Sequence, residues 1–423
     1  MKKPTTIKLP NGLRVLLIPM QEQVTATALV LVETGSKYET KDKNGISHFL
    51  EHMCFKGTTI RPSAQAISHE LDALGCQYNA FTDHEMTGYY AKADSKHFKK
   101  IFEIISDIYL NSTFPESEME KEKGVIVEEI NMYEDMPHRH VQDLFQELLY
   151  GDQPAGWNIA GTRENVRGMK RDDFVKYKKE HYVASATTIV VTGNIDTKSV
   201  LVEAKKHFKD VYTGTKGKKK KTIDKQIKPA VLLKYKESDQ THFVLGVRSF
   251  DMFNKQNPIL SVLGGILGMG MSSRLFIKLR EDMGVAYYVR AGNDTSLDHG
   301  SFQISAGVTN ARAEEVIKEI LKECVKLKNE LVSEQELSKV KSFIIGNSKL
   351  SLESSDDIAN FYGGQEILKR EMKTIDEKAR ELNKVTATDV RNMARKIFTK
   401  KNLNLAIIGP FKDKNKLENI LEF

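Results

Sequence analysis

The sequence has few of the residues that mark secreted or membrane-spanning proteins. Only three cysteines occur in 423 residues, and their unrelated spacing argues against a disulfide framework and for a reducing compartment. No apolar run approaches the roughly 18 residues of a spanning helix, and the lysines at the N-terminus are not followed by an apolar signal segment. We therefore expect a cytoplasmic protein with no membrane partner.

Aromatic residues are scarce where positive charge is dense. The net charge is +7, and much of it lies in the Lys/Gly-rich stretch "TGTKGKKKKTIDKQIKP", residues 213–229. This stretch has no aromatic side chains interleaved with its lysines on which bases could stack, so we expect no nucleic-acid partner. Its composition predicts a solvated, mobile linker that divides the chain almost in half.

The two halves repeat the same order of predicted elements. Each has an apolar strand, a helix, two further strands, two helices of which the second begins at S-x-x-E, and a final strand. At 423 residues the chain is long for one core. The sequence therefore predicts an α+β fold of two homologous domains from internal duplication, each a mixed β-sheet packed with helices, at 1–212 and 230–423.

The segment "GISHFLEHMCFKGT", residues 45–58, places two histidines four positions apart with a glutamate between them. If residues 46–56 form a helix, His48, Glu51 and His52 share one face and Leu50 and Met53 lie on the opposite, apolar face. Two histidines at this spacing can bind one Zn²⁺, and H-x-x-E-H is a zinc-peptidase signature. The alternative is a solvated polar helix face. A zinc site would need a third protein ligand.

A candidate third ligand lies in "SEMEKEKGVIVEEINMYED", residues 117–135. The S-x-x-E pattern of Ser117 and Glu120 predicts a helix that begins at about residue 118. In that helix Glu122 and Glu129 fall inside the apolar stripe, whereas Glu128 faces solvent. Carboxylates are rarely buried without a partner, so the pair indicates either a bound cation or salt-bridged glutamates.

Together the H-x-x-E-H helix and the E-x₆-E helix, whose Glu129 follows His52 by 77 residues, resemble the pitrilysin, or insulinase-like, zinc metallopeptidases. Within this inverzincin family, the sequence is most similar to the mitochondrial-processing-peptidase-like subgroup. The resemblance implies that His48, His52 and Glu129 bind one Zn²⁺ per chain. It also implies that Glu51 is the general base and that Glu122 is the conserved glutamate supporting the ligands.

Two further segments extend the resemblance. "YNAFTDHEMTGYY" looks like the family's cleft-lining strand, which implies that Asn79 and Ala80 bind the substrate backbone. "GGILGMGMSSRLFIKLREDMGVAYYV" looks like the marker of the family's non-zinc domain, which implies that Arg280 and Tyr287 complete the site, with Tyr287 hydrogen-bonding the scissile carbonyl. Without the resemblance, the strand would be an ordinary hairpin, Arg280 a surface ion-pair partner and Tyr287 a core residue.

The resemblance implies a zinc-dependent endopeptidase that hydrolyses short or unfolded polypeptides inside a closed chamber. The family builds its chamber from four such domains and this chain has two, so we expect a homodimer in which Arg280 and Tyr287 act in trans on the partner's zinc centre. Two alternatives remain. The chain could be a non-catalytic scaffold or peptide-binding subunit, or it could be one half of an obligate heterodimeric processing peptidase with a zinc-free partner.

Overall fold

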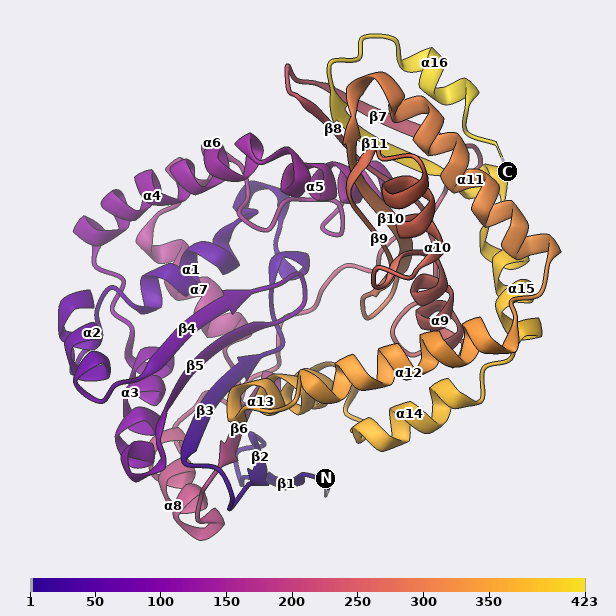
Figure 1. The fold of residues 1–423 in the computed structure, drawn as a ribbon. Coiled ribbons are helices and arrows are strands. Elements are labelled where there is room, and N and C mark those ends of the chain that lie inside the picture. The colour runs from indigo at the N-terminus through magenta and orange to yellow at the C-terminus, as the bar shows by residue number, and fades with distance from the viewer. Residues whose placement is uncertain (1–2, 423) are drawn as a thin grey trace. The chain divides into compact units, whose positions relative to one another are not determined.

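The computed structural model describes residues 3–422 and divides the chain into two compact units (Figure 1). Neither unit is continuous in sequence. The first unit comprises the chain up to Asn131, Asn158–Lys220 and Lys349–Thr374. The second comprises Met132–Trp157, Lys221–Ser348 and the chain from Ile375 onward.

The first unit contains a six-stranded sheet in the order β1-β2-β6-β3-β5-β4. Its strands are β1 (Thr5–Lys8), β2 (Arg14–Pro19), β3 (Thr25–Val32), β4 (Gln77–Thr82), β5 (Thr87–Asp94) and β6 (Thr187–Gly193). Only β2 and β6 run parallel, and the other neighbours are antiparallel. The sheet is therefore mixed, and β1 and β4 are its two edge strands.

The second unit contains a five-stranded sheet in the order β7-β11-β8-β10-β9. Its strands are β7 (Ala230–Tyr235), β8 (Gln240–Arg248), β9 (Ala286–Thr295), β10 (Gly300–Thr309) and β11 (Asn404–Gly409). Here β7 and β11 are the parallel pair. Apart from β1, the order and direction of the strands repeat those of the first sheet, so the predicted α+β fold with internal duplication is confirmed.

Helices cover one face of the first sheet and form the main core of that unit. They are α1 (Ile46–Cys54), α2 (Ala64–Ala73), α3 (Phe98–Asn111), α6 (Arg163–Gly168), α7 (Arg171–His181) and α8 (Thr197–Phe208), together with most of α4 (Glu116–Asp135). The other face of this sheet packs against α13 (Ser355–Gly364), which the chain reaches only in its second half (Figure 1).

The second unit has the same layering. One face of its sheet packs against α9 (Asn257–Gly268), α10 (Arg274–Phe276), α11 (Ala313–Asn329), α12 (Glu334–Leu350), α14 (Ile375–Asn383), α15 (Ala387–Ile397) and α16 (Lys414–Asn419). The opposite face packs against α5 (Pro137–Tyr150), which comes from the first half of the sequence.

The compact units therefore differ from the predicted domains 1–212 and 230–423, because the two halves exchange a helix. Each sheet has a second apolar face that must be buried by a helix. In the first sheet Leu29 and Leu31 pack against α13, and in the second sheet Val244 and Ile408 pack against α5. Burying this apolar surface stabilises the fold equally well whichever half of the chain supplies the helix. The exchanged segments are 132–157 and 349–374.

The predicted linker is irregular in structure, and one predicted helix start needs correction. Residues 213–229 contain no helix or strand in the described chain, but they are not free of the units: Lys216 pairs with Glu33 at 2.5 Å, and Thr222 bonds Asp298. Helix α4 begins at Glu116 rather than at about 118, so Ser117 lies within the helix. Pro115 directly precedes the helix, and its fixed φ favours a start at that point.

All three cysteines are free, and Cys54 and Cys324 are buried. Across residues 3–422, every helix is too short or too polar to cross a bilayer.

Candidate metal centre

Helix α1 presents two histidines and a glutamate on its polar side because its apolar side is fixed in the core. Phe49, Leu50 and Met53 are fully buried against the sheet. The side chain of His48 is 12% exposed and that of His52 is 21% exposed. The periodicity of the sequence thus leaves both imidazoles at the edge of the core, where they are accessible to a small ligand.

The start of α1 is held by a residue that the sequence analysis missed. The N-cap is Gly45, in a left-handed conformation at φ +99°, and it offers no side chain to the free N–H groups. Instead the buried Glu39 carboxylate accepts hydrogen bonds from the backbone N–H groups of Gly45 and Ser47, each at 2.8 Å, and from the Asn44 side chain at 2.9 Å. A carboxylate here also complements the positive end of the helix. The one signal in the sequence is an acidic residue six positions before a glycine.

The structure brings His48, His52 and Glu129 together across α1 and α4. The Nε2 atoms of the two histidines are 3.3 Å apart, and each lies 3.7 Å from Oε2 of Glu129. Ligand atoms about 2.0–2.1 Å from a tetrahedral zinc are separated by about 3.3–3.4 Å. The three donor atoms are therefore spaced as ligands of one ion, and the N/N/O set is one that zinc accepts. Glu128 is exposed on the other side of α4.

Glu122 fixes the orientation of the His52 ring through the nitrogen that does not face Glu129. Nδ1 of His52 lies 2.9 Å from Oε1 of Glu122, whose side chain is only 6% exposed. If Nδ1 carries the proton and donates it to this carboxylate, the lone pair of Nε2 faces Glu129, as in carboxylate–histidine–metal arrangements. The other carboxylate oxygen of Glu122 pairs with Nζ of Lys56 at 2.6 Å. Lys56 is the second residue that the sequence analysis missed.

The electrostatics of the group suit a metal site. Burial, together with the neighbouring His52, lowers the pKa of His48 to about 3, so its imidazole is neutral at pH 7. Burial opposes charge on His52 as well, but the hydrogen bond to Glu122 and the nearby carboxylates raise the pKa of His52 overall. A metal ion would therefore compete with a proton at His52 rather than at His48.

Glu51 lies on the same face without belonging to the group of three. Its Oε2 accepts a 2.6 Å hydrogen bond from Oγ1 of Thr82 at the end of β4. Burial raises the pKa of Glu51, against the opposing effect of that hydrogen bond. A carboxylate with a raised pKa next to a metal site is suited to accept and return a proton. Thr82 was also missed, although it ends the "NAFT" strand on the same side as Ala80.

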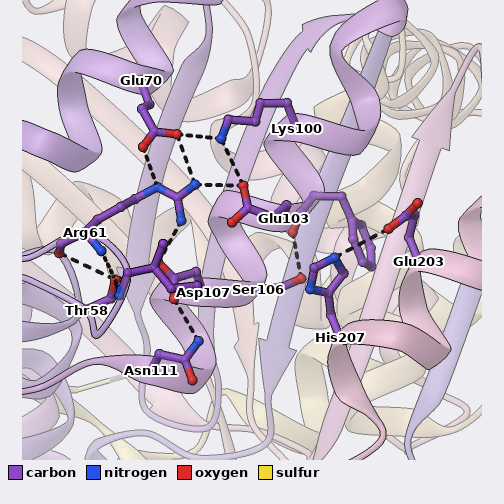
Figure 2. Close-up of polar contacts among 12 residues, drawn as sticks. Thr58, Arg61, Glu70, Lys100, Glu103, Ser106, Asp107, Asn111, Glu203 and His207 are labelled. Atoms are coloured by element: carbon purple, nitrogen blue, oxygen red, sulfur yellow. Dashed lines mark hydrogen bonds and ion pairs between the residues drawn. The ribbon is translucent and has the colours of Figure 1, made fainter.

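The loop after α1 is locked by a buried arginine. Figure 2 shows Arg61, which is 3% exposed, between carboxylates of α2 and α3. It makes two bonds to Glu70, at 3.0 and 3.1 Å, and one each to Glu103 and Asp107, both at 2.7 Å. Thr58 of the same loop donates to Asp107 at 2.6 Å. This network fixes the loop that also carries Lys56.

The strand β4 places Asn79 and Ala80 at the sheet edge. Asn79 is exposed, and its Oδ1 accepts a hydrogen bond from the backbone N–H of Ala80 at 2.9 Å. A side-chain partner is expected for an N–H on the open side of an edge strand, where no neighbouring strand supplies a carbonyl. These residues are therefore accessible for pairing with an added strand.

Arg280 and Tyr287 lie in the second unit and are adjacent to each other. Arg280 belongs to the π-helical turn Ile277–Asp282, and its guanidinium donates to the backbone carbonyls of Ala286 and Tyr287 at 3.0 and 2.7 Å. Tyr287, at the start of β9, is 53% exposed. Arg280 thus fixes the backbone that carries an accessible tyrosine side chain. Single π-helical turns occur often at functional sites.

Comparison with known proteins shows the family to which the chain belongs. The profile described as Insulinase (Peptidase family M16) matches residues 14–163, and the profile described as Peptidase M16 inactive domain matches residues 168–343. The chain belongs to the M16 peptidase family. The match to the insulinase profile covers His48, His52 and Glu129, and the match to the inactive-domain profile covers Arg280 and Tyr287.

M16 relatives match over nearly the full chain. A Bacillus subtilis protein named as an uncharacterized zinc protease is 36% identical over 400 residues, which cover 95% of this chain and 97% of that protein. A Rickettsia felis protein, also named as an uncharacterized zinc protease, is 34% identical over 418 residues, which cover 95% of this chain and 97% of that protein. A crystal structure of a protease from Helicobacter pylori has the same fold, with a TM-score of 0.91 at 23% identity over 96% of this chain and 99% of that one.

Proposed function

We propose that this M16 protein is a zinc-dependent endopeptidase that hydrolyses short or unfolded polypeptides. The observation that carries the proposal is the spacing of three donor atoms on α1 and α4, with Glu51 beside them. His48, His52 and Glu129 would bind one zinc ion per chain. Zinc bound to such a set supplies a Lewis acid and a water whose pKa is about 7.

The chain's own residues would then carry out proton transfer and orientation. Glu51 would accept the proton of the attacking water and later give it to the leaving amine. The hydrogen bond from Thr82 would hold the Glu51 carboxylate in place, and Glu122 would keep His52 in the tautomer that binds metal through Nε2. The hydroxyl of Tyr287 would donate a hydrogen bond to the oxyanion that develops on the scissile carbonyl.

The substrate would bind as an added strand at the edge of β4. Its backbone would displace the Asn79 side chain from the N–H of Ala80 and pair with that edge. Main-chain pairing of this kind requires an extended segment, so unfolded chains and short peptides would bind and folded proteins would not. Substrate sequence would enter through side-chain pockets rather than through the pairing itself.

We further propose a homodimer with two sites, in which Arg280 and Tyr287 act on the partner's zinc centre. One chain contains both the candidate metal ligands and the Arg/Tyr pair, so two identical chains supply everything that two sites need. This assembly would enclose the substrate in a chamber of four homologous domains.

Mixing two inactive variants tests both parts of the proposal. Glu51→Gln and Tyr287→Phe homodimers should each be nearly inactive on a flexible peptide. After subunit exchange, about half of the dimers would be mixed, and each would have one intact site if Tyr287 acts in trans, so activity should recover to about one quarter of wild type. No recovery despite demonstrated exchange would contradict action in trans.

The metal itself is tested by removal and return. Chelation should abolish peptide cleavage and one zinc equivalent per chain should restore it. Glu128→Gln, which changes an exposed glutamate one position before Glu129, should behave as wild type and serve as the control. Full activity in the thoroughly chelated protein would rule out a zinc peptidase.

A further inference from the structure

The edge strand β4 has different surroundings on its two faces. On one face Thr82 bonds Glu51 of α1, and Ala80 packs against the core cluster that contains α1. On the other face Phe81 packs with Leu31 in the cluster that includes α13. This alternation follows from the period of two in a strand.

A cavity of about 390 Å³ lies on the face away from Glu51. Its walls are largely apolar and are formed by Leu31, Phe81, Met86 and Tyr90, and α13 contributes Asn360 and Gly364. The volume is within the range of small-ligand sites, about 300–1,000 Å³. Asn79 and Ala80 of the edge strand also line it, so the cavity is continuous with the strand that the substrate would pair with.

A peptide added to β4 would have the same alternation as β4 itself. Side chains on one side of the peptide would point toward the face of Glu51, and the intervening ones would point toward the face of Phe81 and the cavity. The cavity adjoins three consecutive residues of the strand, Asn79, Ala80 and Phe81. Because side chains on one face of a strand recur at every second residue, a stretch of this length can receive one substrate side chain in a given register.

We propose that this cavity is a specificity pocket for one large apolar side chain of the substrate, with Asn360 as the residue that selects against charge. The inference rests on the proposed peptidase function and adds the class of substrate. The apolar walls provide no partner for a charged group, and burying an unpaired charge is costly. Asn360 is exposed on α13 and offers a neutral amide where a charged side chain would otherwise find its counter-ion.

The exchange of helices brings Asn360 to the pocket. Asn360 comes from the segment 349–374, which lies far from β4 in sequence but belongs to the same compact unit. Substrate selection would therefore depend on a residue outside the match to the insulinase profile at residues 14–163. Changing Asn360 should alter which peptides are cut without altering the candidate metal group.

The experiment is cleavage of a randomised, flexible peptide mixture, with the cut products sequenced by mass spectrometry. Wild type should select Leu, Met or Phe at one position relative to the cut and should be indifferent at the two positions next to it. In Asn360→Asp, cleavage of peptides with Lys or Arg at the selected position should rise about fivefold relative to wild type. In Asn360→Lys, cleavage of peptides with Asp or Glu there should rise by a similar factor, as expected for a partly exposed ion pair. Asn419→Lys, an exposed asparagine at the end of α16, is the matched control and should reproduce the wild-type pattern.

The two proposals fail in different ways. If wild type cuts the mixture but selects no apolar residue at any position, or if both Asn360 variants keep the wild-type pattern, the pocket is refuted and the peptidase stands. If wild type with zinc bound cuts nothing, the proposed function fails and the pocket proposal fails with it.

Discussion

Replacing Glu122 by Gln should weaken zinc binding although Glu122 is not placed to touch the ion. The Glu122 carboxylate accepts from Nδ1 of His52 at 2.9 Å and pairs with Nζ of Lys56 at 2.6 Å. Although burial opposes it, these two contacts lower the pKa of Glu122, so the group is charged at pH 7. Glutamine keeps the shape but removes the negative charge, and it leaves the Lys56 ammonium without a counter-charge near the metal. Both consequences disfavour Zn²⁺.

The expected size is a 10- to 100-fold loss of zinc affinity, about 1.4–2.7 kcal/mol, as for other partners of metal-binding histidines. The assay is competition with a chromophoric zinc chelator at pH 7.5, with circular dichroism to show that the variant is folded. Glu128→Gln on the exposed side of the same helix is the control. The double variant Glu122→Gln/Lys56→Met should recover part of the loss, because it removes both charges together. Zinc affinity within twofold of wild type in Glu122→Gln would refute the role given to this carboxylate.

Two further predictions concern the elements that support the site. Arg61→Met should lower the free energy of unfolding by about 3–5 kcal/mol, because it leaves the buried Asp107 carboxylate without its charged partner; a loss below about 1 kcal/mol in urea titration would contradict this. The bonds from Arg61 lower the pKa of Glu70, and they outweigh burial to lower that of Glu103. This part of the stability is therefore present above about pH 4.5 and is lost as pH falls through the folded-state pKa values, so acid sensitivity in that window should be weaker in Arg61→Met. Glu39→Ala should lower the free energy of unfolding by about 2–4 kcal/mol, because it leaves the N–H groups of Gly45 and Ser47 at the start of α1 unpaired. Glu39→Gln should lower it by less than half of that amount. Equal melting temperatures for Glu39→Ala and wild type would show that the cap is not needed.

Much of the fold was predictable because it is encoded locally. The repeated order of strands and helices follows from hydrophobic periodicity, and α1 was predicted to within two residues at each end. The choice of Glu129 over Glu128 followed from helical geometry, and the structure places Glu129 beside the histidines. These features depend on neighbours in sequence, which is why periodicity captured them.

The features that were not predicted depend on contacts distant in sequence. Periodicity shows that α5 and α13 are apolar on one side, but it does not show which sheet each covers, and each covers the sheet of the other half. Glu39 and Lys56 look like ordinary surface charges until the backbone brings Glu39 to the start of α1 and Lys56 to Glu122. The start of α4 was misplaced because the capping pattern at Ser117 competes with Pro115.

The most direct test of the peptidase proposal is cleavage of a flexible peptide by wild type and by Glu51→Gln, each loaded to the same measured zinc content. Glu51 lies beside the three donor atoms without belonging to the group, so the variant should bind zinc as wild type does. The proposal predicts that it nevertheless loses cleavage by about 100-fold or more, the usual contribution of a general base. Equal cleavage by both proteins, or no cleavage by the zinc-loaded wild type, would contradict it.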